Sequence, residues 1–95
     1  PVQKLKIDKS FVIGVADDPD SAIICRSVIG LGHNLGMELV AEGVERRTDL
    51  AFIQRHGCDW AQGFYFSAAL PMPELKQWLA TQSPASGELS ATTRG

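Results

Sequence analysis

The stretch LVAEGVERR, residues 39–47, is the part of the sequence that decides the fold. An apolar run of three residues ends in Glu42, a glycine follows, and a second carboxylate comes at Glu45. A short apolar run bounded by turn signals is typical of a buried strand in a parallel sheet. Parallel α/β folds build their sites at the carboxyl ends of strands, so Glu42 indicates a polar site there.

Upstream of this strand, the pattern predicts one more strand and a helix. Residues 3–8 alternate polar and apolar side chains, which is the period of a strand. Turn signals in residues 12–20 lead to a helix that Asp20 or Ser21 can cap, and Gly36 stands where a left-handed stop would end it. An apolar stripe at helical spacing is expected to face the core: Ile24, Val28, Leu31 and Leu35.

Downstream, the same alternation continues twice. A second helix is expected near Thr48, whose hydroxyl can cap it, and Gly57 would stop it. Residues 58–63 form the third predicted strand, and Pro73 suits the first turn of a last helix. The side chains expected to point inward from these two helices are Leu50 and Ile53, then Leu75, Trp78 and Leu79. Three strand–helix units in succession predict an α/β fold with parallel strands.

Composition limits the class of protein. The 95 residues are 44% hydrophobic with a net charge of -2, which fits a globular core and gives no basic field for a nucleic-acid polymer. No apolar run approaches the roughly 20 residues of a membrane span, and no signal peptide is visible. Cys25 and Cys58 match no metal or redox spacing, so we expect buried free thiols in a reducing cytoplasm.

The last residues, 81–95, differ in composition from the rest. They contain one large apolar side chain, Leu89. So little apolar surface cannot offset the entropy of ordering the segment, and we expect a disordered tail. The predicted domain is therefore residues 1–80.

Polar side chains close each of the three predicted strands. Lys6 and Asp8 end the first, Glu42 the second and Gln62 the third, and a glycine directly follows both Glu42 and Gln62. Glycine lets a backbone or a ligand approach closely. The pattern predicts one site that combines an amine, an acid and an amide.

Each of these residues also has an ordinary structural explanation. Lys6 can be a solvated lysine at a strand end, and Gln62 can satisfy a backbone group. Glu42 and Glu45 can cap the following helix. Two histidines near helix ends suit the helix dipole better than catalysis: His33 and His56.

Three segments resemble consecutive motifs of the EAL domain, the cyclic di-GMP phosphodiesterase family. They are KLKIDKSF at residues 4–11, LVAEGVE at residues 39–45 and GCDWAQGFYFS at residues 57–67. Their separations are similar to those of the family as well, with 36 residues from Lys6 to Glu42 and 20 from Glu42 to Gln62. The resemblance extends over about residues 5–79.

The resemblance implies a modified TIM barrel that hydrolyses cyclic di-GMP to linear pGpG with Mg²⁺ or Mn²⁺. By position in the motifs, Lys6 matches the catalytic lysine near the attacking water, and Glu42 the catalytic glutamate at the metal centre. Gln62 matches the glutamine near the site, while Asp8 and Glu45 match acidic positions that we assign to the supporting shell.

The resemblance also implies that much of the domain lies upstream. The Glu-Ala-Leu signature, an asparagine, another glutamate and paired aspartates are absent, and in the family they precede KLKID. We expect residues 1–80 to be the C-terminal three strand–helix units of a barrel of about 250 residues. Alone they should bind metal poorly, turn nothing over, and expose sheet edges and apolar faces. The rest of the barrel, a homodimer or a strand-swapped assembly would then cover those surfaces.

Three hypotheses for function remain at this point. The first is a metal-dependent cyclic di-GMP phosphodiesterase. The second is a degenerate EAL domain that binds cyclic di-GMP as a receptor without cutting it. The third is a piece of an unrelated α/β barrel.

Overall fold

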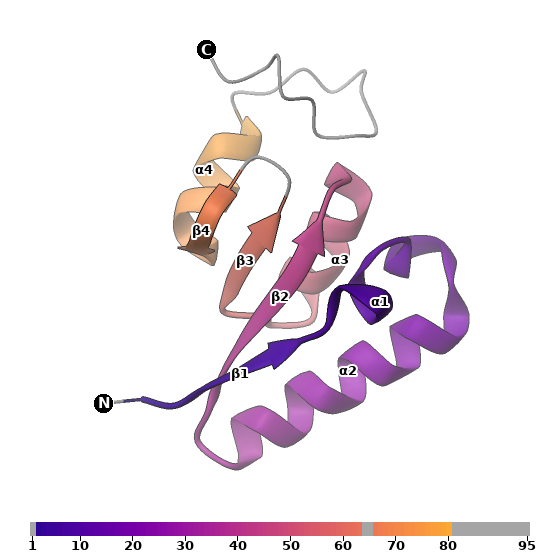
Figure 1. The fold of residues 1–95 in the computed structure, drawn as a ribbon, viewed down its shortest axis with the longest axis vertical. Helices are drawn as coiled ribbons and strands as arrows, with labels where there is room; N and C mark the ends of the chain where they lie inside the picture. Colours follow the sequence, from indigo (N-terminus) through magenta and orange to yellow (C-terminus); the bar gives the residue numbers. More distant parts are fainter. Residues whose placement is uncertain (1, 64–65, 81–95) are drawn as a thin grey trace.

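The computed structural model describes residues 2–63 and 66–80, which form one four-stranded sheet with helices (Figure 1). The elements, in chain order, are β1 (Lys4–Ile7), α1 (Lys9–Val12), the 3₁₀ helix η1 (Val15–Asp17), α2 (Pro19–Asn34), β2 (Glu38–Val44), α3 (Arg47–Arg55), β3 (Trp60–Gly63), β4 (Phe66–Pro71) and α4 (Met72–Ala80). The predicted α/β class is confirmed. The predicted tail, 81–95, and the side chains of Trp78 and Leu79 lie outside the described residues.

The sheet has the order β1-β2-β3-β4, and its first three strands are parallel, as predicted. The fourth strand, β4, runs antiparallel to β3 and was not predicted. Residues 64–71 carry no alternation of polar and apolar side chains, so they lack the period that identifies a strand. The last unit is therefore a strand pair followed by a helix.

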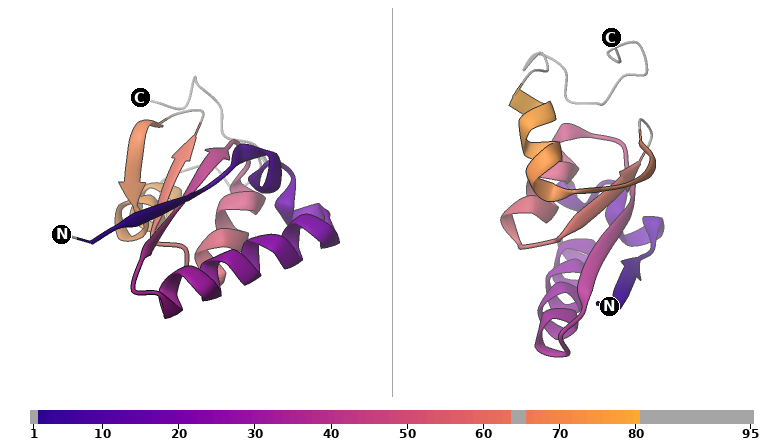
Figure 2. Two further views of the ribbon diagram at one scale, coloured as in Figure 1. Left: turned by 60° about the horizontal axis from the view of Figure 1, so that its bottom comes forward. Right: turned by 90° about the vertical axis from the view of Figure 1, so that its left-hand side faces the viewer.

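The core lies between the sheet and the helices α2, α3 and α4, which cover one face of the sheet (Figure 2). Alternate residues of the strands point into it and are buried: Ile7, Leu39, Ala41, Val44 and Ala61. Leu50, Ile53 and Leu75 come from α3 and α4 and are fully buried, as predicted. Side chains of the other register positions stay on the opposite face.

The predicted inward face of α2 is wrong. Ile24, Leu31 and Leu35 are 37%, 59% and 66% exposed, and only Val28 of that stripe packs partly against the core. The buried positions are Ser21, Cys25, Ile29 and Gly32. A Cβ on Gly32 would lie 2.7 Å from Leu39 Cδ2. The helix therefore approaches the sheet so closely at Gly32 that no side chain fits at this position.

Both predicted helix starts need correction. Helix α2 begins two or three residues earlier than a cap at Asp20 or Ser21 predicts, because the carboxylate of Asp18 accepts hydrogen bonds from the backbone N–H groups of both residues. Helix α3 starts after Arg46 without a side-chain cap, and Thr48 lies within it. The predicted helix ends are confirmed by the positive φ values of Gly36 and Gly57, 76° and 90°.

The segment between β1 and α2 is more ordered than its turn signals suggest. Asp8 caps α1, Gly14 takes a left-handed conformation with φ of 78°, and η1 follows. Val12 and Val15 are fully buried. These two apolar side chains therefore anchor the segment to the core, although its sequence resembles that of a loop.

Both cysteines are buried free thiols, as predicted. The Sγ of Cys25 donates to the Phe11 carbonyl oxygen, and that of Cys58 to the carbonyl oxygens of Leu39 and Trp60. Burial raises the pKa of Cys58 to about 11, and burial followed by the negative charge of Asp49 raises the pKa of Cys25.

We therefore expect neither thiol to react with iodoacetamide at pH 8 while the protein is folded, because thiolate is the reactive form. Peptide mapping by mass spectrometry before and after addition of denaturant measures this directly. Rapid labelling of either residue in the folded protein would contradict the packing described above.

Several apolar side chains of α1, of its C-cap residue and of α2 are exposed, among them Phe11, Ile13 and Leu31. The strand β1 lies at an edge of the sheet. What covers them stays a prediction. Among the described residues, no helix is long and apolar enough to cross a membrane.

Candidate active site

Lys6 and Glu42 meet on the face of the sheet that the helices leave open. Their neighbours Ile7 and Ala41 point into the core, so strand alternation turns Lys6 and Glu42 the other way. Lys6 Nζ lies 3.5 Å from Glu42 Oε2, and the two side chains are 66% and 31% exposed. The structure thus unites an amine and a carboxylate that are 36 residues apart in the chain.

Gln62 lies beside this pair. It is the register partner of Glu42 across the β2–β3 ladder, and its buried neighbour Ala61 shows that it shares the open face. Because the three strands are parallel, the residues gather at one edge of the sheet, close to the carboxyl ends. Glu42 does not end its strand, however, since β2 continues to Val44 through a shift of register.

The opposite end of the same face carries a second polar layer. Lys4 Nζ lies 3.8 Å from the centroid of a Trp60 ring, and Trp60 Nε1 donates a 2.8 Å hydrogen bond to Glu38 Oε1. Val40, between the two layers, is 2% exposed although it is outside the main core cluster. Val40 is therefore shielded from solvent on this face as well.

Asp8 and Glu45 directly follow the two strands that carry Lys6 and Glu42. The carboxylate of Asp8 caps α1, accepting from the Oγ of Ser10 at 2.6 Å and from its backbone N–H at 2.9 Å. The side-chain bond and then the backbone bond hold the pKa of Asp8 below its usual range. Glu45 is an exposed residue between β2 and α3. The supporting roles of both residues stay predictions.

The two histidines lie towards the other end of the strands from Lys6 and Glu42. His33 Nε2 is 2.7 Å from Asp59 Oδ2, and the same oxygen accepts the backbone N–H of Leu39 at 2.9 Å, where β2 begins. The ring of His56 lies 4.4 Å from that of Phe52. Both contacts lie at the C-terminal ends of helices, α2 for His33 and α3 for His56. They give the two histidines structural partners, in agreement with the structural explanation of these residues.

Gly43, directly behind Glu42, does not open a space as its position suggests. A Cβ there would lie 2.5 Å from Lys9 Cβ and 3.6 Å from Ile13 Cγ1, and its φ is 78°. The volume is thus filled by α1 and the turn after it. Likewise, a Cβ on Gly63 would clash with the Val44 carbonyl group. Both glycines serve close packing of backbone.

Gly43→Ala is expected to destabilise the domain by about 2 kcal/mol, from a left-handed backbone and from the contact with Lys9. Gly36→Ala is the matched control, because Gly36 has a φ of 76° with open space around it. It should show the backbone effect alone, about 1 kcal/mol. Chemical denaturation of both variants measures the difference, and equal losses would rule out the steric contact.

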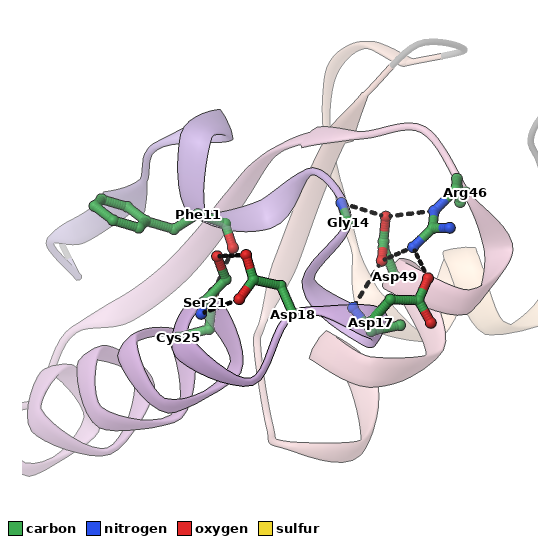
Figure 3. A network of polar contacts seen from close by, with 9 residues as sticks. Phe11, Gly14, Asp17, Asp18, Ser21, Cys25, Arg46 and Asp49 are labelled. Atoms are coloured by element: carbon green, nitrogen blue, oxygen red, sulfur yellow. Dashed lines mark hydrogen bonds and ion pairs between the residues drawn. The ribbon is translucent and has the colours of Figure 1, made fainter.

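One further cluster, drawn in Figure 3, was not predicted from the sequence. Asp49, 1% exposed, accepts hydrogen bonds from Gly14, Ala16 and Arg46, and Arg46 also binds Asp17. Burial pushes the pKa of Asp49 upward, but the bonds from Arg46, Ala16 and Gly14 outweigh it and hold that pKa below its usual range. At a helix start, Arg-x-x-Asp is equally the spacing of an exposed i,i+3 ion pair, so it does not predict a buried cluster.

The comparisons with known proteins agree with this geometry. The sequence model of the EAL domain family matches residues 1–69. The probable cyclic di-GMP phosphodiesterase PdeD of Escherichia coli K12 is 38% identical over 80 residues, which are 84% of this chain and 15% of that protein. MucR of Pseudomonas aeruginosa, a bifunctional diguanylate cyclase/cyclic di-GMP phosphodiesterase, is 39% identical over 75 residues, 79% of this chain and 11% of that protein.

Solved EAL structures match as well. The EAL domain of Mycobacterium smegmatis DcpA has a TM-score of 0.65 and 40% identity, covering 95% of this chain and 38% of that one. The phosphodiesterase PaMucR in its c-di-GMP complex has a TM-score of 0.64 and 39% identity, with coverage of 79% and 30%. The fold and the open polar edge thus define part of a TIM-like barrel.

The chain belongs to the EAL domain family. It spans 11 to 15% of the length of the two curated relatives described above, and matches only part of the solved domains. The hypothesis of an unrelated α/β barrel is therefore excluded.

Proposed function

We propose that this chain supplies the last part of an EAL domain that hydrolyses cyclic di-GMP to linear pGpG. The single observation that supports this most strongly is the 3.5 Å pair of Lys6 Nζ and Glu42 Oε2 on the open face of the sheet. Relatives named as cyclic di-GMP phosphodiesterases support the choice of substrate.

The residues of the pair have distinct tasks in this proposal. Lys6 carries a mobile point charge that can orient the attacking water or offset negative charge on the phosphate. Glu42, which is only 31% exposed, holds its carboxylate beside that charge. Gln62 can hydrogen-bond the substrate through its amide. Asp8 would support the site by fixing the start of α1, and Glu45 would act from beyond the end of β2.

Mg²⁺ or Mn²⁺ fits one residue of this site in its donor chemistry. Carboxylate oxygen is the ligand these ions prefer, and Glu42 offers it close to the carboxyl edge of the strands. Such a metal polarises the phosphate and acidifies the bound water. Within residues 2–63 and 66–80, no group of three or more His, Cys, Asp or Glu side chains can hold a metal ion. The proposal therefore takes the other ligands from elsewhere in the domain.

The alternative is a receptor that binds cyclic di-GMP without cleaving it. The exposed ammonium group of Lys6 favours this reading as much as it favours catalysis, because a phosphate binds a cation in either case. The rest of the barrel is the partner we propose for the exposed faces of α1 and α2, ahead of a homodimer or a strand-swapped assembly. A cytoplasmic location belongs to the same proposal.

The test uses an intact EAL domain that contains this chain. It is incubated with cyclic di-GMP and Mg²⁺, and pGpG is followed by chromatography while binding is measured by calorimetry. Formation of pGpG supports the phosphodiesterase. Binding without product would establish the receptor, and neither binding nor product would overturn both.

A further inference from the structure

One buried carboxylate joins the segments that follow β1 and β2. Asp49 Oδ2 accepts hydrogen bonds from the backbone N–H of Gly14 and from Arg46 Nε, both at 3.0 Å. Its Oδ1 accepts from the backbone N–H of Ala16 at 2.9 Å and from Arg46 Nη2 at 3.0 Å. Figure 3 shows the carboxylate between the Gly14 turn and the Arg46 guanidinium. Segments more than 30 residues apart in the sequence are thereby fixed to each other.

The residues at the start of helix α3 make this connection instead of capping the helix. Arg46 is the N-cap residue and makes no side-chain cap bond, and Asp49 stands at the third helical position. An acidic side chain there ordinarily turns back to the N-cap backbone. A cation at a helix start is unfavourable with respect to the helix dipole as well. Local rules that are broken in favour of a distant contact indicate a functional constraint.

The connection extends from the turn to the candidate active site. The turn that Asp49 holds follows directly on α1, and Gly43 is approached by Lys9 of α1 and by Ile13, the C-cap residue of α1. Gly43 adjoins Glu42, and α1 starts at Lys9, two residues after the end of β1, the strand that carries Lys6. A displacement of the turn would therefore move α1 against Gly43 and change how Lys6 faces Glu42.

We propose that Arg46 and Asp49 are positioning residues for the Lys6–Glu42 pair. The proposal rests on the phosphodiesterase function given above. Neither residue touches the pair. They act by fixing the turn at Gly14 and Ala16, and through it the contact of α1 with Gly43. Asp17, 72% exposed, contributes only the outer end of the cluster.

The test compares three variants of an intact EAL domain that contains this chain. Arg46→Gln removes the two charged hydrogen bonds to Asp49 and the one to Asp17. Asp17→Asn weakens only the outer contact. Arg55→Gln makes the same change at an exposed position at the other end of α3. All are assayed at a temperature at which circular dichroism shows them folded.

For Arg46→Gln we expect kcat to fall about tenfold while KM stays within about twofold, the effect of a misplaced reacting group rather than lost binding. The two control variants should keep the wild-type kcat. A merely structural role would lower the melting temperature of Arg46→Gln and leave the kcat of the folded enzyme unchanged, which would overturn the proposal.

Hydrogen exchange supplies a readout that does not need activity. In Arg46→Gln, amides of residues 9–13 and 42–45 should exchange faster together, whereas exchange that rises only in residues 14–17 would contradict the connection. If the wild type makes no pGpG, the phosphodiesterase proposal fails by itself. The exchange pattern then decides whether Arg46 and Asp49 position the Lys6–Glu42 pair.

Discussion

Replacing Glu42 by glutamine in an intact EAL domain that contains this chain is expected to lower kcat by about 100-fold or more. The amide keeps the size of the side chain and removes its negative charge. In this structure that charge lies 3.5 Å from Lys6 Nζ and is two-thirds shielded from solvent. The variant loses both its anionic oxygen donor and the partner that holds the ammonium group in place.

The measurement is the initial rate of pGpG formation at saturating cyclic di-GMP. Glu74→Gln is the matched control, since Glu74 is exposed in the first turn of α4, outside the candidate site. The control should keep the wild-type rate and melting temperature. A Glu42→Gln variant that is folded and retains more than about a tenth of the activity would remove Glu42 from the catalytic machinery.

The position of the candidate site on the sheet could be predicted from the sequence. A strict period of two places Lys6 opposite to Leu5 and Ile7, and an apolar run that meets a carboxylate places Glu42 near the carboxyl end of β2, which continues to Val44. Parallel pairing then brings the carboxyl ends of the strands to the same edge of the sheet, independently of the conformation of the loops. These inferences depend on local patterns and on one rule of topology, and the structure confirms the shared face.

The face of α2 could not be read in the same way. The helix has apolar residues around much of its circumference, and periodicity selected the larger ones, Ile24, Leu31 and Leu35. The side that packs on the sheet has Cys25, Ile29 and Gly32 instead, and at Gly32 the distance to Leu39 leaves no room for a Cβ atom. That distance is set by tertiary packing, which a single helix sequence does not contain.

The Asp49 cluster could not be predicted from the sequence for a related reason. The bond from Gly14 to Asp49 joins residues 35 apart, and no local rule connects a turn after β1 with the third residue of α3. Asp8 was assigned to the site because it follows a strand, and the structure adds hydrogen bonds from Ser10 to its carboxylate. The strand-end pattern did not show this capping contact, which leaves the supporting role of Asp8 a prediction.

Removing the Asp49 carboxylate is the second change expected to have a large effect. Asp49→Ala would leave the backbone N–H groups of Gly14 and Ala16 without their acceptor and Arg46 without its buried partner. We expect a loss of about 3 kcal/mol in the free energy of unfolding. In an intact EAL domain this corresponds to a melting temperature lower by about 6–12 °C.

The dependence on pH identifies the charge as the cause. Because the folded-state pKa of Asp49 is depressed, its contribution is complete above the unfolded-state value of about 3.9 and is lost as the pH falls through the folded-state pKa. The difference in melting temperature between the wild type and Asp49→Asn should therefore stay constant from about pH 7 to about pH 5. Below about pH 4 it should shrink, since the wild-type carboxyl group becomes neutral too.

Asp49→Asn is the informative partner of the alanine variant because it keeps the volume. In the wild type each oxygen of the Asp49 carboxylate accepts two hydrogen bonds from N–H donors. In the asparagine variant an amide nitrogen replaces one of these oxygens, and it cannot accept them. It should therefore recover only part of the stability lost in Asp49→Ala. An asparagine variant as stable as the wild type at pH 7 would mean that the cluster needs a hydrogen-bond acceptor but no charge. In that case the guanidinium group of Arg46 would contribute little to the position of the Gly14 turn.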